Sequence, residues 1–265
     1  MKIRFSKIVC FALATIFINS GCEQTYTQET DTLAVGPIAE PELSGFAAQT
    51  IDASGGLSAW RKTKGLQLNC VVAFYQPDES YYLTEQRYEI YPWSNSIRIS
   101  TLEPEGMYVW QLSKGKFNVL EGGEQFEDLP NTVSSRCLAE SILNIVTAPA
   151  RFLDNYVEFV KETTPVKMHG QWYYLIDRKN KLNAAPAERL SEAIFYQNRD
   201  NFAIDMIWFP RISGSKLLMV RGYDFEVVES GSILIPTRIE IYRTDALGIS
   251  QELLVKIDCN DIIFN

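Results

Sequence analysis

Residues that commonly carry out catalysis are few in this chain, and none stands in a familiar catalytic spacing. The single histidine, His169, lies in a predicted hairpin turn, where it is a solvated loop residue rather than a general base. Ser213 and Ser230 each precede one glycine but lack the second glycine and the strand-turn-helix context of a serine nucleophile. Glu85 and Glu89 fall in one predicted strand and are expected to be solvated. We therefore predict no catalytic residue, no metal site and no cofactor.

The N-terminal segment has the pattern of an export signal. Basic residues at positions 2, 4 and 7 precede an apolar run from Ile8 to Ile18, and the small residues Ser20 and Gly21 lead into Cys22. The run is too short for a membrane-spanning helix, which needs about 20 apolar residues. A basic start, a short apolar stretch and small residues at the cut are typical of a cleaved signal. We expect residues 1–21 to be removed and the chain to function outside the cytoplasm.

The thiol of Cys22 is a candidate for covalent lipid attachment. Its position resembles the lipobox of bacterial lipoproteins, in which the cysteine receives diacylglycerol and the new N-terminus is acylated. Two or more acyl chains make a stable membrane anchor. Asn19 departs from this motif, and the alternative is an ordinary signal peptide in which Cys22 is incidental. Glu23 resembles lipoproteins sorted to the outer membrane, so the resemblance implies a lipid-anchored envelope protein that faces the periplasm.

The rest of the chain divides into a tether and one domain. Residues 22–40 are polar, contain Gly36 and Pro37 and have no hydrophobic period, so they are predicted to be a flexible tether. Residues 41–265 have no second linker, and a chain that is 46% apolar can bury one sizeable core at this length. We therefore expect a single domain over 41–265.

Charge and cysteine content limit the partners and cross-links. The chain has 25 basic and 33 acidic residues, and loss of the three basic signal residues changes its formal net charge from −8 to −11. Nucleic acids are bound through clustered Lys and Arg, so no nucleic-acid partner is expected. Cys70, Cys137 and Cys259 remain after Cys22. They allow at most one disulfide in an oxidising compartment, and their spacing suggests no metal site.

From Gly65 onward the sequence is typical of an antiparallel all-β domain. Runs of β-branched and aromatic residues alternate with short turns such as Asn198–Asn201, which favours hairpins between neighbouring strands and hence a meander. The predicted strands cover residues 66–75, 81–91, 96–102, 107–112, 117–121, 157–163, 172–178, 193–196, 202–209, 217–227, 232–242 and 252–264.

Alternation along these strands predicts an inner face. Val72 and Phe74 share one face of the first strand, and Met219 and Arg221 share one face of a later strand. Arg221 either pairs with a carboxylate or reaches a rim, or else it is a polar anchor inside a ligand cavity. The inward candidates for binding a hydrophobic ligand are Val72, Phe74, Met206, Trp208, Met219, Arg221 and Ile239.

Two amphipathic helices are predicted to cover this face. Phe46 and Ile51 lie on one stripe of an N-terminal segment, and Leu138 and Ile142 lie on one face of a segment from about residue 135 to 147. Helices this short are not stable alone, so each must lay its apolar stripe on the concave side of the sheet. The expected architecture is a mainly β half-barrel with these four residues in its lid.

The order of these elements resembles a known superfamily. An amphipathic helix, the stretch Ala53–Lys62 (ASGGLSAWRK) before the first strand, and Ile235–Ile239 (IPTRI) near the end are similar to the LolA/LolB-like lipoprotein carriers over residues 43 to 265. The resemblance implies an unclosed antiparallel barrel whose concave face, covered by helices, holds acyl chains. The carriers shuttle lipoproteins across the periplasm, and the membrane-anchored member receives them. The insertion near 179–189 departs from the carriers.

The sequence thus favours a membrane-anchored, non-enzymatic lipoprotein that binds a lipid, another hydrophobic ligand or a lipoprotein acyl chain. One alternative is a structural or protein-interaction lipoprotein whose barrel is filled by its own side chains. Another is a carbohydrate-binding or hydrolytic periplasmic protein, since the 12% aromatic content would also suit a sugar ligand.

Overall fold

A computed structural model describes residues 45–121, 133–182, 191–211, 217–228 and 232–264. The predicted signal peptide, Cys22 and the predicted tether lie outside these described residues, as do Ser213 and Ser230. The helices are α1 (Gly45–Ala53), α2 (Leu57–Lys62), α3 (Ser135–Val146) and α4 (Ala148–Arg151). The strands are β1 (Leu66–Tyr75), β2 (Tyr81–Tyr91), β3 (Ser96–Glu103), β4 (Val109–Ser113), β5 (Lys116–Glu121), β6 (Val157–Lys161), β7 (Val166–Met168), β8 (Gln171–Asn180), β9 (Glu192–Asn198), β10 (Ile204–Arg211), β11 (Leu218–Val227), β12 (Leu234–Thr244) and β13 (Ser250–Phe264).

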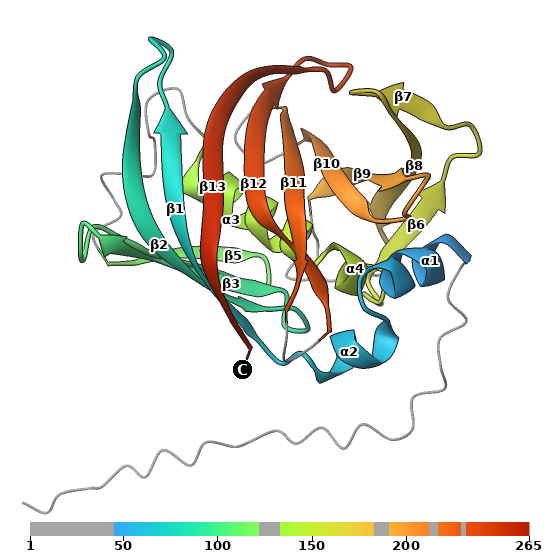
Figure 1. Cartoon of the computed structure of the whole chain (residues 1–265), viewed down its shortest axis with the longest axis horizontal. Coiled ribbons are helices and arrows are strands. Elements are labelled where there is room, and N and C mark those ends of the chain that lie inside the picture. The colour runs from blue at the N-terminus through green and yellow to red at the C-terminus, as the bar shows by residue number, and fades with distance from the viewer. Residues whose placement is uncertain (1–44, 122–132, 183–190, 212–216, 229–231, 265) are drawn as a thin grey trace, which may run out of the picture. The chain divides into compact units, whose positions relative to one another are not determined.

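All these strands join one antiparallel sheet that does not close. The order is β5-β4-β3-β2-β1-β13-β12-β11-β10-β9-β8-β6, with β7 paired to β8. Most neighbours are consecutive in the chain, as a meander requires, and the exceptions are the pairing of the first strand with the last and the pairing of β6 with β8. Figure 1 shows the curved sheet with α3 on its concave side. The predicted fold class, an unclosed antiparallel half-barrel with a few helices, is confirmed.

One buried row of side chains crosses the concave face. Residues opposite each other in neighbouring strands point to the same side of a sheet, so the strand register identifies such rows. This row consists of Tyr82, Phe74, Val255, Ile241, Val220, Ile207, Phe195 and Ile176. Tyr82 is partly buried and packs against the main hydrophobic core, and the others belong to this core together with the apolar residues of α3. The row therefore defines the side of the sheet that the helix covers.

Helix α3 lies across this row and joins distant strands. It contacts β3 and β4 on one side and β10, β11 and β12 on the other. Ser134 caps its start by accepting a hydrogen bond from the backbone amide of Cys137. Pro149 lies in the first turn of the separate one-turn helix α4. No helix among the described residues is long and apolar enough to cross a membrane.

A disulfide joins the first and last strands. Cys70 on β1 and Cys259 on β13 are opposite each other in the strand register and are bonded. The third cysteine, Cys137, is a buried thiol on α3. The disulfide closes a covalent loop with a sequence separation of 189 residues. A loop of that length removes much conformational freedom from the unfolded chain.

We predict that the double variant Cys70→Ala/Cys259→Ala lowers the free energy of unfolding by about 4 kcal/mol, because the long loop is no longer closed in the unfolded state. Urea unfolding followed by tryptophan fluorescence measures this loss. Reductant should destabilise the wild type by a similar amount and leave the double variant unchanged. Equal sensitivity of the two proteins to reductant would contradict the prediction.

Candidate functional site

The concave face brings together most of the predicted ligand and lid residues. Val72 and Phe74 on β1 and Ile239 on β12 belong to the same buried core as the predicted lid residues. The lid residues Ile51, Leu138 and Ile142 are all buried, and Phe46 is partly buried against them. The ring of Phe46 meets the ring of Phe152 edge to face, with 5.9 Å between the centroids. Val72 and Phe74 therefore lie on the helix-covered side of β1.

Four other predicted ligand residues lie on the opposite, outer face of the sheet. Met206 and Met219 form a second hydrophobic cluster, and Trp208 packs against it. Arg221 stands opposite Met206 in the register of β10 and β11, so it shares their face. We call this group the outer cluster. Its buried members are Tyr173, Tyr196, Met206 and Met219, and its partly buried members are Val166, Met168, Leu175, Ile194, Trp208 and Tyr242.

The expectation of one shared inner face fails here because β10 and β11 are apolar on both sides. Ile207 and Phe209 face α3, whereas Met206 and Trp208 between them face the outer cluster. A register shift between Ile204 and Met206 also interrupts the alternation of β10. Period-two alternation fixes which residues share a face, but it does not say which face the helix covers.

A buried polar network connects α3 to β8. The guanidinium of Arg178 donates to the Asn144 side-chain oxygen and, at 2.6 Å, to the Ser191 carbonyl. The Ser191 hydroxyl donates to the Glu140 carboxylate, and the Asn144 amide donates at 2.7 Å to the Glu140 carbonyl. Burial lowers the pKa of Arg178 to about 10, so it stays a cation at neutral pH. A buried cation on β8 thus fixes the polar side of α3.

Two further buried side chains attach α1 and α4. Gln197 on β9 donates to the carbonyl of Phe46, at 2.9 Å, and to the hydroxyl of Thr50, at 2.7 Å. Arg151 on α4 donates to the Asn95 side chain at 2.6 Å and to the Pro92 carbonyl. It also forms an ion pair with Asp154 at 3.2 Å. Helices α1, α3 and α4 are therefore each held by apolar packing and by one buried polar side chain, which comes from the sheet for α1 and α3 and from the helix itself for α4.

These polar attachments were not predicted from the sequence. Arg178 follows Ile176 by two residues on β8, so the alternation already places it on the core-facing side. The same holds for Gln197, which follows Phe195 by two residues on β9, whereas Arg151 has no such signal. Their partners are 147 and 56 residues away along the chain.

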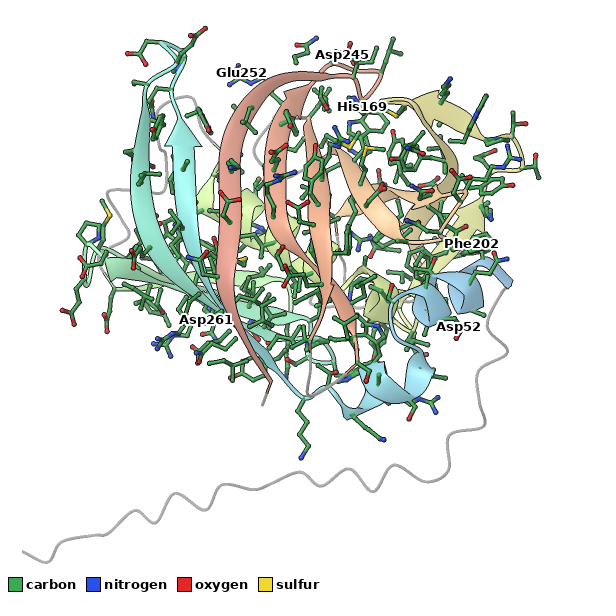
Figure 2. The ribbon with its side chains drawn as sticks, viewed as in Figure 1. Asp52, His169, Phe202, Asp245, Glu252 and Asp261 are labelled. Carbon is green, nitrogen blue, oxygen red and sulfur yellow. A yellow bond between two sulfur atoms is a disulfide. The ribbon has the colours of Figure 1, made fainter. Side chains whose placement is uncertain are left out.

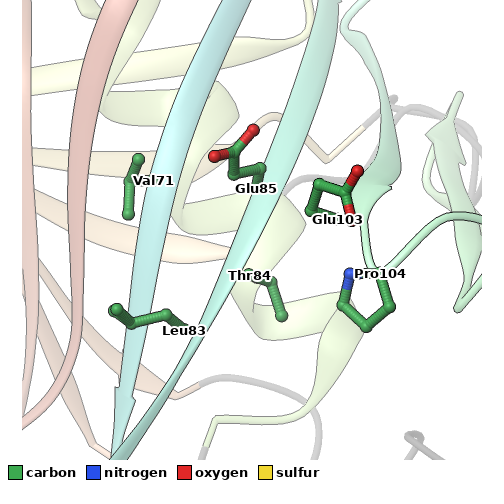
Figure 3. A pocket seen from close by; sticks show the side chains of 6 residues that line it. All are labelled: Val71, Leu83, Thr84, Glu85, Glu103 and Pro104. Atoms are coloured by element: carbon green, nitrogen blue, oxygen red, sulfur yellow. The ribbon is translucent and has the colours of Figure 1, made fainter.

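A depression of 380 Å³ lies over β1, β2 and the end of β3 (Figure 3). Its lining residues are Val71, Leu83, Thr84, Glu85, Glu103 and Pro104. Glu85 and Glu103 are opposite each other in the register of β2 and β3, which is unfavourable for two like charges. Leu83 shares the outer-facing row of Arg221, so this depression opens on the side of the sheet away from α3. It contains none of the predicted ligand residues.

Two solved structures share this architecture. A LolA superfamily protein from Nitrosomonas europaea is 13% identical, and the match covers 83% of this chain and 92% of that chain with a TM-score of 0.51. A putative outer membrane lipoprotein-sorting protein domain from Vibrio parahaemolyticus is 8% identical, with 83% and 90% covered and a TM-score of 0.52. The domain has a LolA-like fold. No protein-family profile and no curated protein sequence matches the chain. At these identities the likeness shows the fold alone.

We predict that Arg178→Ala destabilises the LolA-like domain by about 3 kcal/mol, because it leaves buried acceptors on Asn144 and Ser191 without a donor. Urea unfolding at neutral pH measures the change. The matched control is Arg98→Ala on β3, whose exposed side chain lies 3.7 Å from Glu89 and should contribute no more than about 0.5 kcal/mol. Similar losses in the two variants would mean that the polar network does not stabilise the attachment of α3.

Proposed function

We propose that this chain is a membrane-anchored, non-enzymatic envelope lipoprotein whose LolA-like domain binds a lipid or another hydrophobic ligand between the sheet and the helices. The observation that carries the proposal is the wide apolar concave face, which is covered by short helices rather than by a second sheet. Val72, Phe74 and Ile239 on the sheet and Leu138 and Ile142 on α3 are the residues that would contact the ligand.

The helices are suited to moving as a cover. Helices α1 and α4 are only 9 and 4 residues long, and isolated helices of this length are marginal in water. A ligand that displaces α3 would exchange apolar contacts with the helix for apolar contacts with its own chain. The main cost of displacing α3 is then the loss of the polar attachment through Arg178, which consists of few hydrogen bonds and can form again.

The names of the structural neighbours support this ligand class. One neighbour is named as an outer membrane lipoprotein-sorting protein domain and another as a LolA superfamily protein. We therefore propose acyl chains, either of lipids or of lipoproteins, as the preferred ligand. Lipid on Cys22 and the tether over 22–40 would hold the domain near the periplasmic surface of the outer membrane.

A specific observation favours a second function. Eleven of the 12 residues of α3 are buried, including the polar residues Glu140, Ser141 and Asn144. A helix buried on both sides also suits a barrel that is permanently filled by its own side chains. In that case the protein would be a structural or protein-interaction lipoprotein, and its outer surface would carry the function.

The tryptophans of the chain distinguish these two functions. Trp110 on β4 is fully buried in the main core on the side of α3, whereas Trp172 on β8 is 42% exposed. All described helices, strands and their core lie within residues 45–264, so residues 41–265 can be studied without the anchor. We predict that palmitate shifts the ¹⁹F NMR signal of Trp110 in protein labelled with 5-fluorotryptophan, in a saturable way and at one equivalent.

Single Trp110→Phe and Trp172→Phe variants assign the two signals. The signal of Trp172 should not move, because this side chain is exposed and belongs to neither hydrophobic cluster. Movement of neither signal, with no lipid retained in native mass spectrometry, would favour the filled barrel. Movement of the Trp172 signal alone would place binding outside the concave face and contradict the proposal.

We also predict that the full chain, expressed in a diderm bacterium with an alkyne analogue of palmitate, becomes labelled and sediments with membranes. Cys22→Ala should abolish the label, because the thiol is the proposed acceptor of diacylglycerol. Cys137→Ala is the matched control, since this thiol is buried and should not affect labelling. An unlabelled wild type, or a labelled Cys22→Ala variant, would mean that the N-terminal segment is an ordinary signal peptide.

A further inference from the structure

Arg221 on β11 has an unusual position on the outer face of the sheet. Its guanidinium carbon lies 4.8 Å from the ring centroid of Tyr223, but no described residue forms a hydrogen bond or an ion pair with it. Its Nε is shielded from solvent and has no acceptor. A buried donor without an acceptor costs about as much as a hydrogen bond to a charged group contributes. The other described arginines that are not exposed all have polar or charged partners: Arg87, Arg136, Arg151, Arg178, Arg238 and Arg243.

The carboxylate directly opposite Arg221 is already engaged. Glu240 on β12 faces Arg221 in the strand register. One of its oxygens accepts a hydrogen bond from the Tyr242 hydroxyl, and the other lies 3.8 Å from Nε of Arg238. Arg238 also pairs with Asp224 at 3.1 Å. Arg238 is therefore shared between Asp224 and Glu240, and neither carboxylate forms an ion pair with Arg221.

The second nearby carboxylate, Asp205, does not fill this role. One of its oxygens accepts from the Tyr173 hydroxyl at 3.2 Å and from the Asn198 amide at 3.3 Å. Its other oxygen is buried without a partner, and the group forms no ion pair with Arg221. Burial raises the pKa of Asp205 to about 6, so its charge is also weakly held near neutral pH.

The hairpin of β7 and β8 places a second nitrogen donor near Arg221. His169 stands at the tip of this hairpin, with a positive φ of 48° (Figure 2). Partial burial of the ring, and then the positive charge of Arg221, lower the pKa of His169. The guanidinium is therefore close enough for its charge to act on the imidazole. Met206, opposite Arg221 on β10, and Met168 on β7, which packs against the same cluster, line this region with polarisable apolar surface.

From this arrangement we propose that the outer face of β10–β12, beneath the β7–β8 hairpin, binds an oxyanion group, a carboxylate or a phosphate, through Arg221. The guanidinium offers the donors for one such group, the ring of Tyr223 lies against it, and His169 stands at the tip of the hairpin above it. The methionines accept an attached apolar portion. The site is on the opposite side of the sheet from the concave face. It does not depend on the function proposed above.

The single histidine makes this site directly measurable. The untagged full chain, labelled with ¹³C-histidine and kept in a non-ionic detergent, gives one imidazole signal, whose pH titration reports the pKa of His169. An anion bound to Arg221 should offset the guanidinium charge and raise this pKa by about half a pH unit. We expect a saturable rise with inorganic phosphate or with sodium hexanoate. The probe that acts at the lower concentration identifies the preferred group.

Two variants and a salt control decide the outcome. Arg221→Gln should raise the pKa of His169 without any anion and remove the response to both probes. Arg98→Gln, which changes an exposed arginine on β3, should behave as the wild type. Sodium chloride at matched ionic strength should give only a gradual, unsaturated change. The proposal is overturned if neither probe exceeds the chloride effect, or if the response survives in Arg221→Gln.

Discussion

The structure depends on one helix, which buries the concave face of a curved sheet that is too wide to bury this face by itself. Helix α3 contacts β3 and β4 at one side and β10 to β12 at the other, although these strands are separated by β2, β1 and β13 in the sheet. A helix of 12 residues is about 18 Å long, which suffices to span the concavity but not to form independently in water. The sheet and α3 must therefore be stabilised by the same contacts.

The burial of α3 on all sides creates a second requirement. Its polar residues Glu140, Ser141 and Asn144 have left water, and each buried polar group needs a partner inside the domain. Arg178 on β8 donates to Asn144, and the Ser191 hydroxyl donates to Glu140, whereas the Ser141 hydroxyl has no hydrogen-bond partner among the described residues. The guanidinium of Arg178 lies 5.2 Å from the centroid of the Phe195 ring, on the same face of β8 as Ile176. Apolar contacts position α3 only loosely, whereas this directional network selects one rotation of the helix. The hydrogen bonds of this network form only in the closed arrangement, and they are lost when α3 moves.

Much of the fold was predictable from local sequence patterns, and the failures have physical reasons. The strands, the meander and α3 follow from alternation and from a helical stripe, because each signal is local. The short strand β7 was missed, since three residues beside the His169 turn carry no alternation that can be recognised. The sides of Met206 and Met219 were misplaced because their strands are apolar on both faces, so burial alone does not separate the helix side from the outer side. The pairing of Cys70 with Cys259 depends on the meeting of the first and last strands, which no local pattern reports.

Along a single row of the outer face, charged residues on β13 and β12 give way to apolar residues on β10, β9 and β8, and Arg221 on β11 stands where the two parts meet. From β2 to β8 the row reads Leu83, Ala73, Lys256, Glu240, Arg221, Met206, Tyr196 and Leu175. Charged residues can neutralise one another only on the side toward β13, where Glu240 is already shared between Arg238 and Tyr242. On the side toward β9 the neighbours in this row are apolar and covered by the β7–β8 hairpin, which reduces the solvation of the guanidinium, and the nearby Asp205 forms no ion pair with it. A cation in such a position favours any ligand that combines an anionic group with an apolar portion, because each part then meets the side of the boundary that suits it.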